Sequence, residues 1–262
     1  MSGIFKAYDI RGVYGKDLTD ELAYRIGRAY VTFAKCRKIV VARDIRPHSE
    51  PLFQNFVKGA TEQGADVIDL VTPTHYTDII IRALSEEKLP VPVVWNSSAY
   101  EEPETLKRLE GLVDISLPDY KYSDPSLAAK LSGAADYPEK AREAIKEMYR
   151  QTGDFTLDKD GMMLGGVIIR HLVLPGFVEN TLGCLDDITE MFSGENVMIS
   201  LMSQYTPPEK ALPVPSLNRR LTNEEYEKAV GYLYLLGWEN GFVQELSSAE
   251  SEFTPDFDCS GV

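Results

Sequence analysis

The sequence predicts an α/β protein of parallel strands, arranged as a partial or complete (β/α) barrel, with a doubly wound open sheet as the alternative. Short apolar, β-branched runs alternate with helical patterns along the chain. About seven such units follow one another, and strands separated by helices pair in parallel through right-handed crossovers. No long linker interrupts the 262 residues, so we expect one barrel-like domain over residues 1–262.

The predicted strands are short apolar runs bounded by turn residues or charges. The run VIIRHLVL is the longest, and Pro175 and Gly176 end it, which predicts a central strand. The predicted strands are residues 4–10, 38–42, 67–71, 91–95, 113–117, 167–174 and 197–202.

The predicted helices combine apolar residues at helical spacing with recognisable ends. Thr19 caps one helix, and Thr222 with Glu225 forms a capping box for another, which Gly237 ends. The polar stretch 154–161 predicts a turn, and the polar tail 247–262 is expected on the surface. The predicted helices are residues 19–33, 49–64, 102–109, 138–151 and 222–236.

The acidic composition argues against two classes of partner. A formal net charge of −14 disfavours binding to nucleic acid or to anionic membrane surfaces. No run approaches the roughly 20 apolar residues that a membrane-spanning helix needs, and the first residues lack the apolar run of a signal peptide. We therefore expect a cytoplasmic protein with a small-molecule ligand. The sequence predicts no particular protein partner.

The cysteines do not form a metal-binding pattern. Cys36, Cys184 and Cys259 are scattered, with neither CxxC nor CxxxCxxC spacing. Free buried thiols are the expected state, and no metal site is predicted.

Polar side chains recur at the carboxyl ends of the predicted strands, where parallel α/β folds collect functional groups. Together they suit a zwitterionic or nucleotide-like ligand. Each also has a simpler interpretation: a capping loop at 96–98, a surface pair at 119 and 121, a loop histidine at 75 and a core histidine at 171. The candidate ligand-binding residues are Thr72, Thr74, His75, Asn96, Ser98, Asp119, Lys121, His171 and Gln204.

Strand alternation restricts one neighbouring pair. Arg170 and His171 are adjacent within a predicted strand, so their side chains point to opposite faces. At most one of them faces the interior of a barrel, unless a bulge intervenes.

From residue 72 to the end, the sequence resembles the later part of radical S-adenosylmethionine (SAM) proteins of the pyruvate formate-lyase activating enzyme type. The segments TPTHYTDIIIRAL, VVWNSSAYEEPETLKRLEGLVDISLPDYKY, VIIRHLVLPG and LNRRLTNEEYEKA carry this resemblance. It implies a partial barrel that binds SAM across its mouth. Residues 72–75 would then meet the SAM amino group, Asn96 and Ser98 its polar groups, and His171 the nucleoside, with Asp119 and Lys121 on the next strand end.

The chain departs from this family at its central motif. The family holds a [4Fe–4S] cluster on CxxxCxxC, and that motif is absent here. We therefore expect no cluster and no catalytic residues. The expected function is that of an inactive hybrid or a weak binder of SAM and other adenosyl compounds.

The front of the chain resembles a second family, the bacterial phosphomannomutase/phosphoglucomutase enzymes. The segments IFKAYDIRGVYGKDLTDELAYRIGRA, KIVVARDIR and EQGADVIDL, within residues 1–70, carry this resemblance. It implies that Tyr8 and Arg11 lie near a sugar phosphate. The phosphoserine loop and the acidic magnesium loop of that family are absent, so phosphoryl transfer is not expected.

Three functions therefore remain open: adenosyl-compound binding, sugar-phosphate binding, and a structural chimera without ligand. The sequence does not distinguish a natural hybrid of the two families from an engineered one.

Overall fold

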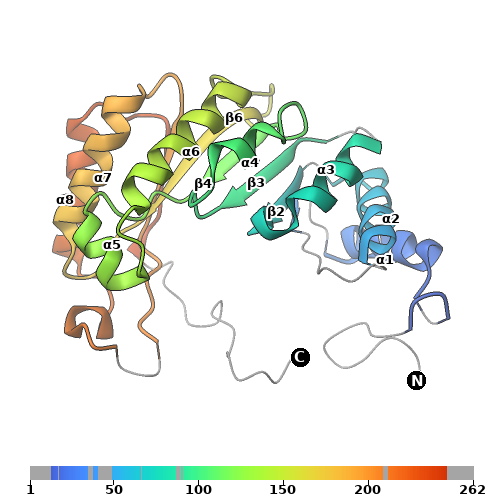
Figure 1. Cartoon of the computed structure of the whole chain (residues 1–262), viewed down its shortest axis with the longest axis horizontal. Helices are drawn as coiled ribbons and strands as arrows, with labels where there is room; N and C mark the ends of the chain where they lie inside the picture. The colour runs from blue at the N-terminus through green and yellow to red at the C-terminus, as the bar shows by residue number, and fades with distance from the viewer. Residues whose placement is uncertain are drawn as a thin grey trace. The chain divides into compact units, whose positions relative to one another are not determined.

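The computed structural model describes residues 13–16, 18–34, 38–40, 49–65, 67–86, 89, 91–208 and 212–246 (Figure 1). The chain divides into two compact units, and each is described by itself. Unit 1 comprises Met1–Ser97 with Glu104–Ser116, and unit 2 comprises Ser98–Pro103 with Leu117–Val262.

The strands form an open, mainly parallel sheet in the order β1-β2-β3-β4-β6-β7-β8. β5 pairs antiparallel with β6 outside this order. Among the described residues the order neither reverses nor closes, so the predicted parallel α/β class is confirmed and the sheet is open. The strands are β1 Lys38–Val40, β2 Val67–Val71, β3 Val93–Ser97, β4 Ile115–Pro118, β5 Thr156–Leu157, β6 Met163–Leu172, β7 Met198–Met202 and β8 Gly241–Val243.

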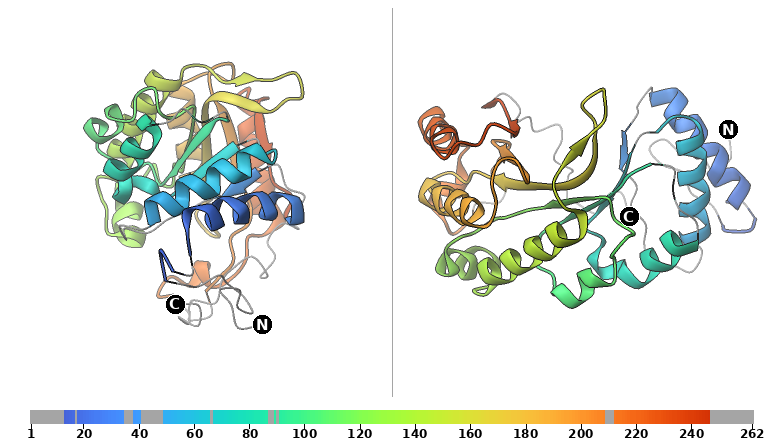
Figure 2. Two further views of the ribbon diagram at one scale, coloured as in Figure 1. Left: turned by 90° about the vertical axis from the view of Figure 1, so that its right-hand side faces the viewer. Right: turned by 90° about the horizontal axis from the view of Figure 1, so that it is seen from above.

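Helices provide the crossovers between successive strands. Right-handed crossovers that advance in one direction place their helices on the same face of a sheet. In unit 2, α6 and α7 accordingly lie on one face of β6 (Figure 2). The helices are α1 Asp20–Ala34, α2 Ser49–Glu62, η1 Pro73–Tyr76, α3 Thr77–Glu86, α4 Pro103–Lys107, α5 Pro125–Ser132, α6 Tyr137–Thr152, α7 Val178–Met191, η2 Pro215–Asn218 and α8 Asn223–Leu235.

Most predicted elements within the described ranges are found, with shifted ends. The strand predicted over 4–10 lies outside the described residues. The turn predicted over 154–161 is wrong in part, because residues 156–157 form β5 and only the segment after them turns. Asp158 holds that turn by accepting hydrogen bonds from the amides of Asp160 and Met162, both at 2.8 Å.

Three helices were not predicted: α3, α5 and α7. The signal for α5 is present in the sequence, because Asp124 caps the helix and Pro125 occupies its first turn. The first residue before α7 is Phe177, which offers no capping oxygen. That helix therefore begins without the local signal on which sequence reasoning depends.

In unit 1, helices α1 and α2 approach each other so closely that two glycines are required. A Cβ on Gly27 would lie 2.0 Å from the carbonyl oxygen of Phe56. A Cβ on Gly59 would lie 2.0 Å from the carbonyl oxygen of Tyr24. Each position therefore brings one helix backbone against the other, with no room for a side chain.

The core of unit 2 lies between its strands and helices α6, α7 and α8. Val167, Ile169, His171 and Val173 of the β6 segment are all buried. The intervening side chains, at positions 168, 170, 172 and 174, are only partly buried. One face of the strand is thus fully covered, whereas the other stays partly accessible.

Glu225 organises the start of α8. Its carboxylate accepts hydrogen bonds from the Gly176 and Thr222 amides at 2.7 and 3.0 Å, and from both terminal nitrogens of Arg219 at 2.7 Å. The Arg219 guanidinium lowers the pKa of Glu225 to about 2. The predicted capping box is confirmed, and the same carboxylate also fixes the turn after β6.

Among the described residues, no helix combines the length and apolarity that crossing a membrane requires.

Candidate functional site

The candidate site lies on the partly accessible face of unit 2, at the carboxyl ends of β4 and β6. Asp119 and Arg170 are direct neighbours in a parallel bridge, which places their side chains on one face. Lys121 follows Asp119 by two residues and so shares that face. Alternation thus brings three charged side chains together.

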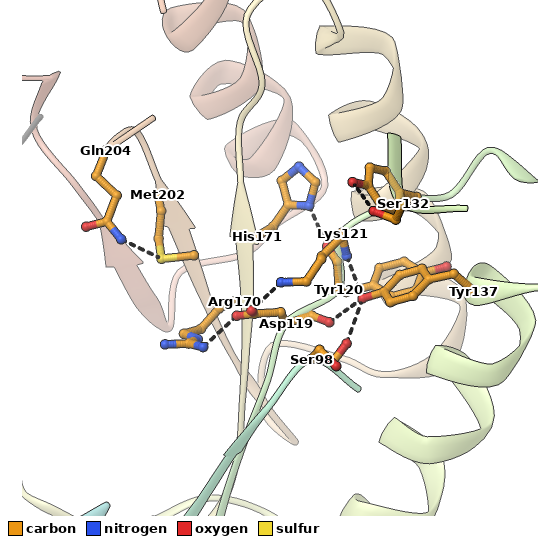
Figure 3. Close-up of polar contacts among 11 residues, drawn as sticks. Ser98, Asp119, Tyr120, Lys121, Ser132, Tyr137, Arg170, His171, Met202 and Gln204 are labelled. Carbon is orange, nitrogen blue, oxygen red and sulfur yellow. Dashed lines mark hydrogen bonds and ion pairs between the residues drawn. The ribbon is translucent and has the colours of Figure 1, made fainter. Parts of the chain in front are cut away.

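These residues form an ion-pair cluster, shown in Figure 3. Asp119 Oδ1 lies 2.7 Å from Arg170 Nη2, and Asp119 Oδ2 lies 2.5 Å from Lys121 Nζ. The exposed fractions of the side chains are 19% for Asp119, 24% for Arg170 and 40% for Lys121. One carboxylate thus lies between two cationic side chains.

His171 lies on the opposite face and belongs to the core. It is 1% exposed, and both ring nitrogens have partners. Nδ1 lies 2.6 Å from the Tyr120 carbonyl oxygen, and Nε2 lies 2.9 Å from Thr181 Oγ1 on α7. A carbonyl oxygen can only accept, so Nδ1 carries the proton and Nε2 accepts from Thr181. Burial lowers the pKa of His171 to about 4, so the ring is neutral at pH 7.

The sequence interpretation placed His171 among the ligand-binding residues, whereas the structure places it in the core with both ring nitrogens bonded within the protein. Of the adjacent pair, Arg170 faces the accessible side, as its contact with Asp119 shows. The interpretation of His171 as a satisfied core histidine, left open by the sequence, matches its surroundings.

Tyr120 ties the end of β4 to the helices behind it. Its hydroxyl donates to Asp187 Oδ2 on α7 at 2.6 Å, and Arg142 Nη1 on α6 lies 3.0 Å from Asp187 Oδ1. Burial raises the pKa of the Tyr120 phenol. The residue between Asp119 and Lys121 is thereby anchored, which fixes the strand that carries the charged pair.

Gln204 lies beyond the end of β7. The β6–β7 register pairs Arg170 with Ser200 and Leu172 with Met202, so Met202 shares the face of the charged cluster. The amide nitrogen of Gln204 contacts Met202 Sδ at 3.8 Å, and its oxygen accepts from Gln244 at 3.2 Å. Ile168, Leu172 and Met202, all partly buried, add an apolar surface next to the charges.

In unit 1 the predicted residues Thr72 and Asn96 lie together. The Thr72 amide donates to the Asn96 carbonyl at 2.8 Å, and the Asn96 side chain donates to Asp69 at 3.2 Å. Thr72 has a positive φ of 51°, which is unusual for a β-branched residue. Thr74 and His75 follow in η1, and the side chain of His75 is exposed.

The remaining predicted residues are Ser98, Tyr8 and Arg11. Ser98 is exposed, and its carbonyl accepts from the Tyr137 hydroxyl at 3.0 Å. Tyr8 and Arg11 lie outside the described residues. The structure thus brings Asp119 and Lys121 into contact in unit 2, and Thr72 and Asn96 in unit 1.

A [4Fe–4S] cluster, which the radical SAM resemblance implies, does not fit the cysteine that the structure describes. Cys184 is fully buried in α7, and burial raises the pKa of its thiol, whereas a cluster ligand must be a thiolate. Cys36 and Cys259 lie outside the described residues. Within the described ranges, no group of three histidine, cysteine or acidic residues is placed to hold a metal ion.

The front of the chain matches a known family. Residues 2–92 match the model of phosphoglucomutase/phosphomannomutase, alpha/beta/alpha domain I. The phosphomannomutases of Klebsiella pneumoniae and Escherichia coli are each 52% identical over 66 residues, which is 25% of this chain and 42% and 14% of theirs. The predicted resemblance of residues 1–70 is confirmed, and the family match extends beyond its predicted boundary.

Two further similarities cover more of the chain. An uncharacterized protein of Methanocaldococcus jannaschii is 36% identical over 160 residues, 60% of this chain and 42% of that protein. The crystal structure of methylornithine synthase matches 91% of this chain and 83% of its own, at 13% identity and a TM-score of 0.47. The chain spans less than half the length of the relatives named here from sequence.

Arg170 is the site residue that sequence reasoning did not select. The sequence signal was present, since Arg170 and His171 had to face opposite ways. The sequence did not show which face of the strand the helices cover. The covered face depends on α7, because the hydroxyl of its Thr181 hydrogen-bonds to the His171 imidazole.

Proposed function

We propose that unit 2 binds a small amphipathic ligand of the adenosyl type, weakly and without an iron–sulfur cluster. The observation that supports this proposal is the cluster of Asp119, Lys121 and Arg170 beside the apolar surface of Leu172 and Met202. Charged and apolar groups therefore share one partly accessible face of the strands.

The charges of the cluster suit a zwitterion. Arg170 and Lys121 can pair with a ligand carboxylate, and Asp119 can pair with an ammonium or a sulfonium group. The side chains of Leu172 and Met202 offer an apolar surface for a flat heterocycle. A SAM-like molecule carries all of these groups. The acidic net charge of the chain makes a polyanionic ligand less suitable.

The expected affinity is low. In the radical SAM family the cluster iron chelates the amino acid end of SAM, and that contribution is not expected here. A few hydrogen bonds worth roughly 0.5–1.5 kcal/mol each, set against the entropic cost of association, suggest a dissociation constant on the order of a millimolar.

We expect binding of SAM and S-adenosylhomocysteine to depend on the charged cluster. Arg170→Ala should weaken binding by roughly tenfold, because a charge-assisted contact contributes about 1.5–3 kcal/mol and solvent screens part of it. Calorimetry or ligand-observed NMR measures this. Lys130→Ala, an exposed lysine on α5, is the matched control and should leave the affinity unchanged. Equal affinity of the wild type and of Arg170→Ala would show that the ligand does not bind at the charged cluster of unit 2.

We also expect no iron–sulfur cluster. Anaerobic reconstitution with iron and sulfide should leave the protein without the charge-transfer absorption of a cluster, because the cysteines are not clustered in the sequence. About four irons per chain after desalting would contradict this. Chelator treatment should leave adenosyl binding unchanged.

A second candidate is sugar-phosphate binding at the front of the chain, which the domain I match favours. Tyr8 and Arg11 would contact the ligand. The loops for phosphoryl transfer are absent, so binding is proposed without turnover. Glucose 1-phosphate in the same binding experiment, with Arg11→Ala as the variant, separates this candidate from the first.

A further inference from the structure

Tyr137, the first residue of α6, has a hydroxyl that contacts three backbone groups at the ends of the strands. It donates toward the Asp119 carbonyl at 2.6 Å and the Ser98 carbonyl at 3.0 Å, and it accepts from the Lys121 amide at 3.0 Å. Two of these groups belong to charged residues of the cluster. The hydroxyl therefore holds the backbone on both sides of Tyr120 (Figure 3).

The ring of Tyr137 is held in place independently of its hydroxyl. It is 3% exposed, and its centroid lies 5.8 Å from that of Tyr100, 6.5 Å from Tyr120 and 5.5 Å from Tyr122. Removal of the oxygen alone should therefore leave the ring packing intact.

The helix that carries Tyr137 is itself fixed to the loop after β3. The Tyr100 hydroxyl donates to Asp136 at 2.7 Å, and Lys140 pairs with Glu102 at 2.5 Å. Lys140 also lies 5.4 Å from the centroid of the Tyr100 ring. These contacts tie the start of α6 to the loop after β3, and the Tyr137 hydroxyl reaches the strand ends from there.

We infer that Tyr137 is a positioning residue, whose hydroxyl sets the separation of Asp119 and Lys121 and thereby the affinity of the ligand site. The part of this inference that concerns ligand affinity rests on the proposed function. Without the hydroxyl, the Asp119 carbonyl and the Lys121 amide lose the hydrogen-bond partner that they share. The backbone that carries the Asp119–Lys121 ion pair is then held less firmly.

The test compares Tyr137→Phe with Tyr122→Phe. The Tyr122 hydroxyl lies 2.9 Å from Ser132 Oγ, away from the strand ends, and its ring belongs to the same aromatic group. Hydrogen exchange of the Lys121 amide, followed by NMR, reports the hydroxyl contact without any ligand. Titration with S-adenosylhomocysteine reports the site.

In Tyr137→Phe, exchange at the Lys121 amide should accelerate by about tenfold or more, as expected for one lost hydrogen bond. Exchange at the Tyr120 amide, which donates to the Arg170 carbonyl, should change little. The dissociation constant should rise by about tenfold. Tyr122→Phe should change neither by more than about twofold.

Unchanged exchange at Lys121 in Tyr137→Phe would overturn the inference. Equal acceleration at Lys121 in both variants would show general loosening of the aromatic group and would also overturn it. Faster exchange with unchanged affinity would separate Tyr137 from ligand binding and refute the positioning role. If the wild-type protein binds no adenosyl compound, the proposed function fails, and the exchange data alone decide whether the hydroxyl holds the strand ends.

Discussion

Gly27→Ala should destabilise unit 1 by about 3 kcal/mol, because the added methyl group meets backbone and not a movable side chain. Its Cβ would lie 2.0 Å from the Phe56 carbonyl oxygen, 2.9 Å from the carbonyl carbon and 3.0 Å from the Ala60 nitrogen. The two helices must separate to accept it. Their separation would open the small core of Val31, Ala60 and Ala65. Gly59→Ala, at the reciprocal contact, should have a similar effect.

The two tryptophans allow each unit to be followed separately. Trp95 is buried in unit 1 and Trp238 in unit 2. Urea unfolding of Gly27→Ala in a Trp238→Phe background therefore reports unit 1 through Trp95 fluorescence. The control is Gly231→Ala on α8 of unit 2, which has nothing within 4 Å of its added Cβ and is followed through Trp238 in a Trp95→Phe background. This control should gain roughly 0.5–1 kcal/mol from helix propensity. A Gly27→Ala protein as stable as the wild type would contradict the backbone contact.

Acidification should destabilise unit 2 by about 3 kcal/mol through His171 alone, because burial lowers the pKa of this histidine from 6.5 to about 4. The unfolded chain takes up a proton below pH 6.5, whereas the folded protein keeps a neutral imidazole until about pH 4. Each tenfold difference in proton affinity between the two states is worth about 1.4 kcal/mol. The stability that depends on this histidine is therefore complete above pH 6.5, and it is lost as the pH falls to 4.

Urea unfolding of a Trp95→Phe protein at about pH 7, 6, 5 and 4, followed through Trp238, measures this loss. The matched variant is His171→Asn, which keeps a donor for the Tyr120 carbonyl but cannot titrate. It should be less stable at neutral pH and should show a flatter dependence on pH. An equal slope in both proteins would assign the acid sensitivity to other groups. In the wild type, NMR of the His171 ring should show no protonation above about pH 5.

The sequence was most informative where a structural feature depends only on residues that are close together in the chain. Thr222 and Glu225 predicted a capping box, and the structure contains both of its hydrogen bonds. The apolar runs predicted β2 at its observed bounds and β1, β3, β4, β6 and β7 with shifted ends, whereas β5 and β8 were not predicted. The prediction was weakest at α7 and β5. The first turn of α7 has no side-chain cap, and the two residues of β5 form a strand only through their pairing with β6.

For the candidate site, the sequence determined the relation of one neighbouring pair. Residues 170 and 171 had to point opposite ways, because side chains alternate along a strand. Residues 119 and 121 follow the predicted strand 113–117, and the structure shows that their side chains form an ion pair. The sequence alone also showed that CxxxCxxC is absent and that the front resembles a phosphohexomutase.

Only the tertiary structure decided which face of the strand is covered. The run VIIRHLVL is apolar on both faces, so its pattern cannot show where the helices pack. The helix α7 supplies Thr181 to His171 and Asp187 to Tyr120, and it thereby covers that face. Arg170 is left on the other side, where Asp119 is its neighbour across the parallel bridge. Pairing between strands that are distant in sequence depends on register, and register is a property of the folded sheet.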